Sequence, residues 1–181
     1  MLPVLLQQMI CEYPSNTKPD NIPVGCVIYS QEPLGNTDGV VMIQSTFGHP
    51  EGVVESSIPV DTFYVGKSNT IHKTIRNKNY RIVHSRSNGN VKITHKINPK
   101  VIQKKASLEA DVLFFLKDLA LQIHNFYGCP MDLELIYNPK EKTVYLVQAR
   151  PIVLLKNGSL ASYINNIDSI KQNLKTSCSL V

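Results

Sequence analysis

Apolar residues in the first part of the chain occur in short runs that are separated by turn-forming residues. The runs that are typical of strands lie at residues 3–12, 24–30, 40–45 and 62–66. Pro, Gly and Asn between residues 33 and 39 predict a turn. Residues 48–52 predict a loop that leads into a short element at Val53-Val54. This pattern favours a sheet of short strands.

The spacing changes to a helical one between residues 106 and 127. Its apolar positions recur every three to four residues, at Leu108, Val112, Phe115, Leu116, Leu119, Ala120 and Ile123. Ser107 is a plausible N-cap, and Asp111 follows in the first turn, where a carboxylate favours the helix dipole. Gly128 and Pro130 then end the helix. We expect one principal helix.

Two further strands are predicted after this helix, at residues 131–137 and 143–149. A turn rich in Asn, Pro and Lys separates them, so they are expected to pair as a hairpin. The chain then becomes rich in Ser and Asn, with weak helical periodicity between 161 and 174. We interpret residues 153–181 as a linker or C-terminal helix leading toward a missing domain.

Four polar side chains are predicted to share one face of this hairpin. Because side chains alternate along a strand, Asp132 and Glu134 point to the same side, and so do Gln148 and Arg150. Carboxylate and amide oxygens suit Mg²⁺, and a guanidinium suits phosphate. Two alternatives remain open at this point: an ordinary solvent-facing strand surface, and a surface salt bridge between Arg150 and Asp132 or Glu134.

Composition narrows the possible functions. The 181 residues are enough for one domain with a sizeable core, and the formal net charge is +5. Residues 67–105 carry many lysines and arginines and no acid, which raises the question of a nucleic-acid partner. They lack the aromatic cluster on which single-strand binders stack bases. We therefore predict β-structure there, with a hairpin turn at Asn88-Gly89-Asn90.

The cysteine spacing and the lengths of the apolar runs do not indicate a disulfide, a cysteine-based metal site or a membrane span. The four cysteines form no CxxC pair and no metal-binding spacing with the histidines, so we expect free thiols in a reducing compartment. No apolar run approaches the length of a bilayer span, and the N-terminus lacks a secretory signal. We expect a cytoplasmic protein.

Several blocks of sequence resemble a known family, and they occur in that family's order. The blocks are Leu5-Leu6-Gln7-Gln8-Met9-Ile10, Pro23-Val24-Gly25-Cys26-Val27-Ile28-Tyr29-Ser30 with Gln31-Glu32-Pro33, Gly48-His49-Pro50-Glu51-Gly52-Val53-Val54, Pro59-Val60-Asp61-Thr62-Phe63-Tyr64, Phe126-Tyr127-Gly128-Cys129-Pro130 and Gln148-Ala149-Arg150-Pro151-Ile152. Together they resemble the N-terminal nucleotide-binding domain of the phosphoenolpyruvate synthase and pyruvate phosphate dikinase family, which has an ATP-grasp fold.

The resemblance implies roles for particular residues. Glu134 and Gln148 would bind Mg²⁺, with Asp132 as a further or outer ligand. Arg150 would hold the phosphates and stabilise charge on the transferring group, which makes it the candidate catalytic residue. Gln7 and Met9 would lie near the adenine, and Glu51 would contact the nucleotide. Pro50 replaces a family glycine beside Glu51, so a phosphate-cradling turn is not expected there.

These observations lead to one expected fold and three possible functions. The fold would be α+β: the C-terminal lobe of an ATP-grasp domain over residues 1–152, mainly an antiparallel sheet with one principal helix. The parent enzyme would use ATP to phosphorylate a histidine on a swivelling domain. The N-terminal lobe and that phosphohistidine domain would be its missing partners, and the isolated chain would be inactive. A non-catalytic ATP-grasp-like binding module is the alternative, and a basic nucleic-acid binder is less favoured.

Overall fold

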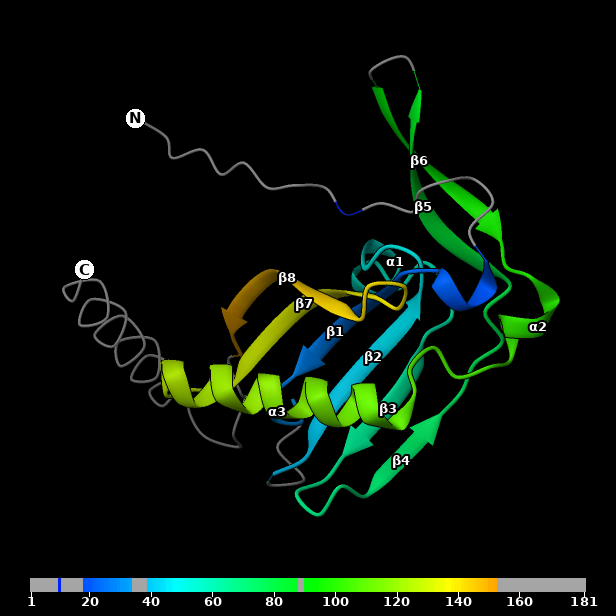
Figure 1. Cartoon of the computed structure of the whole chain (residues 1–181). Coiled ribbons are helices and arrows are strands. Elements are labelled where there is room, and N and C mark those ends of the chain that lie inside the picture. Colours follow the sequence, from blue (N-terminus) through cyan, green and yellow to red (C-terminus); the bar gives the residue numbers. More distant parts are fainter. Residues whose placement is uncertain (1–9, 11–17, 34–38, 88–89, 153–181) are drawn as a thin grey trace, which may run out of the picture.

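The computed structural model describes residues 10, 18–33, 39–87 and 90–152. Its centre is a six-stranded antiparallel sheet with the strand order β4-β3-β2-β1-β7-β8. Its strands are β1 (Val24–Tyr29), β2 (Val41–Phe47), β3 (Asp61–Val65), β4 (Ile71–Thr74), β7 (Met131–Asn138) and β8 (Thr143–Pro151). A separate two-stranded sheet consists of β5 (Tyr80–Ser87) and β6 (Asn90–Ile97), and it projects away from the main sheet (Figure 1).

One long helix, α3 (Ala110–Tyr127), lies across one face of the main sheet (Figure 1). The short elements are a 3₁₀ turn η1 (Pro19–Asn21) and the helices α1 (Glu51–Val54) and α2 (Lys100–Gln103). The α+β class, the antiparallel sheet and the principal helix predicted from the sequence are confirmed. The expected strand at 3–12, apart from Ile10, and the expected helix or linker at 153–181 lie outside the described residues.

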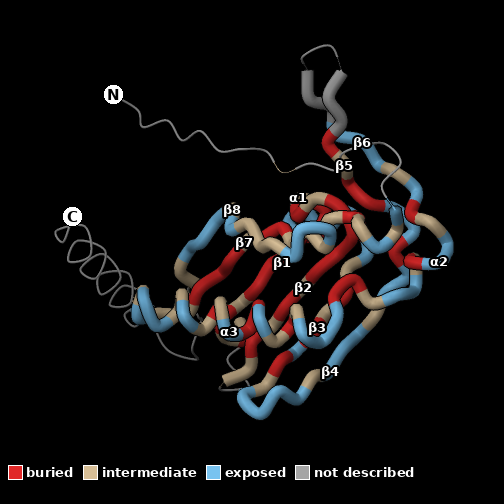
Figure 2. Tube along the Cα trace, viewed as in Figure 1, coloured by how far each residue is buried: buried red, intermediate tan, exposed pale blue. Residues whose placement is uncertain are grey.

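The hydrophobic core lies between α3 and the sheet. Alternate residues of β1, such as Cys26 and Ile28, point toward α3 and are fully buried, together with Leu133 and Leu135 of β7. Each large apolar side chain buried in this way contributes about 1.5–3 kcal/mol to folding. The buried strands at the centre of the sheet are visible in Figure 2. The intervening residues of these strands point to the opposite face of the sheet.

The beginning and the buried face of α3 differ from the sequence prediction. The helix begins at Ala110 with Glu109 at the N-cap, so the prediction that Ser107 caps it was wrong. Ser107 instead donates hydrogen bonds from its amide and hydroxyl to Asp61 of β3, which lies 46 residues earlier in the chain. Phe115 was placed on the apolar face but is 56% exposed, whereas Leu113 is buried. Gly128, with φ of +67°, ends the helix as predicted.

On the face opposite α3, the short helix α1 approaches β1 very closely. A Cβ atom at Gly25 would lie only 2.4 Å from the backbone nitrogen of Pro50. Such a contact is far inside van der Waals distance, so only glycine fits at this point of β1. The close approach packs α1 on β1 and β2, on the sheet face opposite α3.

Candidate functional site

The hairpin of β7 and β8 brings together the four polar residues that its alternation singled out. In the strand register, Asp132 lies opposite Arg150 and Glu134 lies opposite Gln148. Directly opposed side chains have Cβ atoms about 4.5–5.5 Å apart. All four residues occupy the sheet face opposite α3, because Leu133 and Leu135 occupy the face that packs in the core. We call Asp132, Glu134, Gln148 and Arg150 the hairpin patch.

The register of the hairpin shifts directly beyond this patch. The pairing passes from Glu134–Gln148 to Leu135–Leu146, so β8 contains one extra residue at this point. A β-bulge of this kind re-aims the following side chains and is frequent beside functional sites. The bulge therefore separates the polar part of β8 from its apolar first half.

Asp132 and Arg150 form an ion pair within the patch. The Arg150 Nε and Nη2 atoms both lie 2.7 Å from Oδ2 of Asp132. The side chain of Asp132 is 8% exposed and that of Arg150 is 56% exposed. Hydrogen bonding and charge from Asp132 raise the pKa of Arg150, which keeps the guanidinium charged. One alternative considered for Arg150, a salt bridge with Asp132, is thus present in the structure.

The other carboxylate oxygen of Asp132 is the unusual feature of the patch. Its Oδ1 atom is buried and, among the described residues, has no hydrogen-bond partner. A buried acceptor without a partner costs about 1–3 kcal/mol, and buried polar atoms are rarely left in that state. Glu134 and Gln148 lie next to it on the same sheet face, and carboxylate and amide oxygens are the donors that Mg²⁺ uses. The chemistry of these side chains therefore suits a magnesium ion.

Tyr29 belongs to the same surface, although the sequence analysis did not assign it a role. It lies opposite Asp132 in the pairing of β1 with β7. Burial and then the charge of Asp132 raise the pKa of Tyr29, while Arg150 opposes this shift. Its phenol therefore stays protonated and neutral near pH 7. Alternation along β1 could have indicated this position, because Tyr29 follows Gly25 and Val27 on the face opposite the core.

Glu51 lies at the start of α1 and contacts residues other than those of the hairpin patch. Its Oε2 atom lies 3.2 Å from Nε2 of His84 on β5 and 4.0 Å from Nδ1 of His49. Burial and then the neighbouring His84 lower the pKa of His49 to about 4, with Glu51 opposing, so His49 is neutral near pH 7. Gln7 and Met9 lie outside the described residues.

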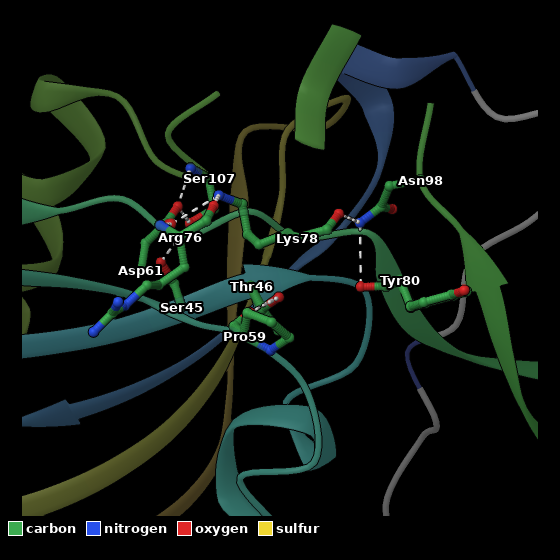
Figure 3. A network of polar contacts seen from close by, with 9 residues as sticks. All are labelled: Ser45, Thr46, Pro59, Asp61, Arg76, Lys78, Tyr80, Asn98 and Ser107. Carbon is green, nitrogen blue, oxygen red and sulfur yellow. Dashed lines mark hydrogen bonds and ion pairs between the residues drawn. The ribbon is translucent and has the colours of Figure 1, made fainter. Parts of the chain in front are cut away.

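Part of the basic segment 67–105 is buried. Lys78 is fully buried and donates from its Nζ to Asp61 at 2.7 Å and to the backbone oxygen of Arg76 at 3.0 Å (Figure 3). Arg81 is 2% exposed and donates to Asn98 at 2.9 Å. These two cations are occupied inside the fold and are not available to nucleic-acid phosphates. The predicted hairpin in this segment is confirmed, with Ser87 paired to Asn90.

A cavity of about 250 Å³ lies on the other side of the sheet, at the start of α3. Its walls include Ile22, Phe47, Ile102, Leu108 and Tyr137. None of the four residues of the hairpin patch lines it. The hairpin patch therefore lies outside this cavity: its Asp132 is buried, whereas Arg150 is more than half-exposed.

Comparison with known proteins identifies the family. Residues 1–169 match the family described as the pyruvate phosphate dikinase AMP/ATP-binding domain, and the chain belongs to this family. The chain is 25% identical over 155 residues to the phosphoenolpyruvate synthase of Pyrococcus furiosus, covering 82% of this chain and 19% of that protein.

Other relatives have related names. The probable phosphoenolpyruvate synthase of Methanocaldococcus jannaschii is 31% identical over 134 residues, covering 73% of this chain and 11% of that protein. The rifampicin phosphotransferase of Bacillus cereus is 28% identical over 129 residues, covering 71% of this chain and 14% of that protein. The chain therefore spans between 11% and 19% of the length of these three relatives.

In the described part of the chain, no helix is long and apolar enough to cross a membrane.

Proposed function

We propose that this chain provides the Mg-ATP-binding surface of a phosphotransferase similar to phosphoenolpyruvate synthase, as the C-terminal lobe of an ATP-grasp domain. Family membership supports an ATP-binding role. The observation that supports this location is the buried Oδ1 of Asp132, which has no partner in the described part of the chain and lies on the same sheet face as Glu134 and Gln148. An acceptor in this state, next to further oxygen donors, is suited to a metal that arrives with the nucleotide.

Each residue of the hairpin patch has a separate proposed task. Asp132, Glu134 and Gln148 would supply oxygens to Mg²⁺, which when bound neutralises charge on the nucleotide phosphates. Arg150 would donate its remaining N–H groups to phosphate oxygens and present a fixed positive charge to the transferring group. The ion pair with Asp132 holds the guanidinium in place before the nucleotide arrives. Because the guanidinium is already held in place, less side-chain entropy is lost when the nucleotide binds.

The remaining predicted contacts stay predictions. Gln7 and Met9 are proposed to contact the adenine, and the described residue that follows them, Ile10, lines a small cavity with His49 and His84. Glu51 is proposed as a nucleotide contact on the basis of the family resemblance. The whole protein's reaction, in which a second ATP-grasp lobe and a phosphohistidine domain would take part, is likewise a proposal that rests on the names of the relatives.

Titration calorimetry with Mg-ATP on residues 1–181 tests the proposal. The informative variant is Glu134→Gln, which keeps the side-chain shape but removes the charge. The matched control is Asp118→Asn, because Asp118 is an exposed acid on α3, which covers the opposite face of the sheet. We expect Glu134→Gln to weaken Mg-ATP binding at least tenfold, about 1.4 kcal/mol, and Asp118→Asn to leave it unchanged. Equal binding by all three proteins, or no binding by the wild type at millimolar nucleotide, would refute the proposal.

A further inference from the structure

Two histidines and a glutamate converge beside α1, away from the hairpin patch. His49 and Glu51 come from the loop and first turn of α1, and His84 comes from β5. One ligand atom of each residue lies within 4.8 Å of the corresponding atoms of the other two. The two imidazole rings are also close, with centroids 4.1 Å apart.

The backbone fixes this arrangement. Gly48 forms an isolated parallel bridge with Ile82, and the amide of His49 donates to the carbonyl oxygen of Ile82 at 2.9 Å. The amide of Gly48 donates to the carbonyl oxygen of Pro23 at 2.7 Å. The loop that carries His49 and Glu51 is therefore bonded to β5 two residues before His84. Side chains that are held on a bonded backbone make a preorganised site.

The hydrogen bond between His84 and Glu51 does not account for the whole cluster. His84 is 6% exposed, and its Nδ1 atom has no hydrogen-bond partner among the described residues. The Nδ1 atom of His49 lies 4.0 Å from Oε2 of Glu51, beyond hydrogen-bond distance, and accepts a long hydrogen bond of 3.4 Å from the backbone amide of Glu51. A small cavity with walls from Ile10, Gly48, His49 and His84 adjoins the rings. Two histidines that lie beside one carboxylate, next to a small cavity, point to a ligand that the ring nitrogens and the carboxylate oxygen share.

We propose that His49, Glu51 and His84 form a binding site for a divalent transition-metal ion, with Zn²⁺ as the best-suited ion. Two imidazole nitrogens and one carboxylate oxygen are a common ligand set for zinc, whereas Mg²⁺ prefers oxygen ligands alone. Zn–N and Zn–O bonds of about 2.0–2.2 Å place tetrahedral ligand atoms about 3.3–3.5 Å apart. The 3.2 Å between Nε2 of His84 and Oε2 of Glu51 already matches, and the 4.0 Å between Nδ1 of His49 and the same oxygen has to shorten.

The metal would join elements that are distant in the sequence. His49 and Glu51 anchor α1, which packs on β1 at Gly25, and His84 anchors the projecting β5–β6 hairpin. A bound ion would therefore connect the small sheet to the main one and leave its fourth coordination position open to water or an anionic ligand. The site uses none of the four residues of the hairpin patch and shares only Glu51 with the proposed nucleotide contacts, so loss of metal binding at His49 and His84 can be told apart from loss of Mg-ATP binding at the patch.

Cobalt spectroscopy on residues 1–181 tests this site, after metal has been removed with a chelator and the thiols have been alkylated. Tetrahedral Co²⁺ gives visible absorption bands, and Zn²⁺ should displace it with a stoichiometry of one. The test variants are His49→Gln, His84→Gln and Glu51→Gln. The matched control is His72→Gln, because His72 is exposed on β4 of the main sheet.

We expect the histidine variants to bind Co²⁺ and Zn²⁺ at least tenfold more weakly, and Glu51→Gln to follow them. The control variant should bind like the wild type, and millimolar Mg²⁺ should not displace the Co²⁺. Absence of the tetrahedral spectrum in the wild type, or equal affinity in all variants, would overturn the proposal. If His84→Gln fails to fold because that ring is buried, the more exposed His49→Gln and Glu51→Gln decide the question.

Discussion

Asp61 and Asp132 are both buried acids at the end of a strand, yet their surroundings differ in a way that separates structure from function. Asp61 and its partner Lys78 are 0% exposed, and every described contact of Asp61 is short (Figure 3). Oδ1 accepts from Lys78 and from the amide of Arg76, and Oδ2 accepts from the amide and hydroxyl of Ser107. Ser45 then donates to the Ser107 hydroxyl at 2.7 Å.

Asp132 has a much less complete set of partners. One of its oxygens is paired with the half-exposed Arg150, and the other has no partner among the described residues. A buried network whose polar atoms are all paired holds elements together. In this case it joins β3, residues 76–78 and the segment that leads into α3. An incompletely satisfied buried acid beside other oxygen donors is instead suited to receive a ligand. We therefore expect a mutation of Asp61 to lower the stability of the fold and a mutation of Asp132 to weaken ligand binding.

The largest expected effect is on stability, at Asp61. Asp61→Ala leaves the buried ammonium of Lys78 without a counter-charge, and breaking a buried pair in this way costs about 3–5 kcal/mol. Urea unfolding followed by circular dichroism measures the change in the free energy of unfolding. A loss below about 1 kcal/mol would show that the network is not structural.

The next effect is on ligand binding, at Asp132. Asp132→Asn keeps the shape of the side chain but removes its charge and replaces one carboxylate oxygen by an NH₂ group, which cannot bind a metal. We expect ATP affinity to lose its dependence on Mg²⁺, while the free energy of unfolding changes by no more than about 1 kcal/mol. Calorimetry with ATP in the presence and absence of Mg²⁺ measures the first quantity. A stability loss as large as that of Asp61→Ala would remove the distinction between the two acids.

The smallest expected effect on stability is at Arg150. Its side chain is 56% exposed, so Arg150→Ala should change the free energy of unfolding by about 0–1 kcal/mol. Its effect on nucleotide affinity should be larger for ATP than for AMP, because the guanidinium is proposed to bind the phosphate chain. Equal losses for the two nucleotides would argue against a phosphate contact.

The sequence predicted the hairpin patch because its pattern is local. The period of two along residues 131–137 and 143–149 determined which side chains share a face, and the short turn determined the pairing. Contacts between distant segments could not be predicted in the same way. Ser107 has the local signature of an N-cap, but a partner 46 residues away uses both of its donors. His49 and His84 meet only because Gly48 pairs with Ile82.

Amide NMR of residues 1–181 during titration with Mg-ATP tests the proposed site most directly. We expect the largest chemical-shift changes at Tyr29, Asp132, Glu134, Gln148 and Arg150, and we expect Glu134→Gln to abolish them. Residues around the cavity at the start of α3, such as Ile102 and Leu108, should not shift. Shifts that centre on that cavity, or a spectrum that millimolar Mg-ATP leaves unchanged, would contradict a nucleotide site at the hairpin patch.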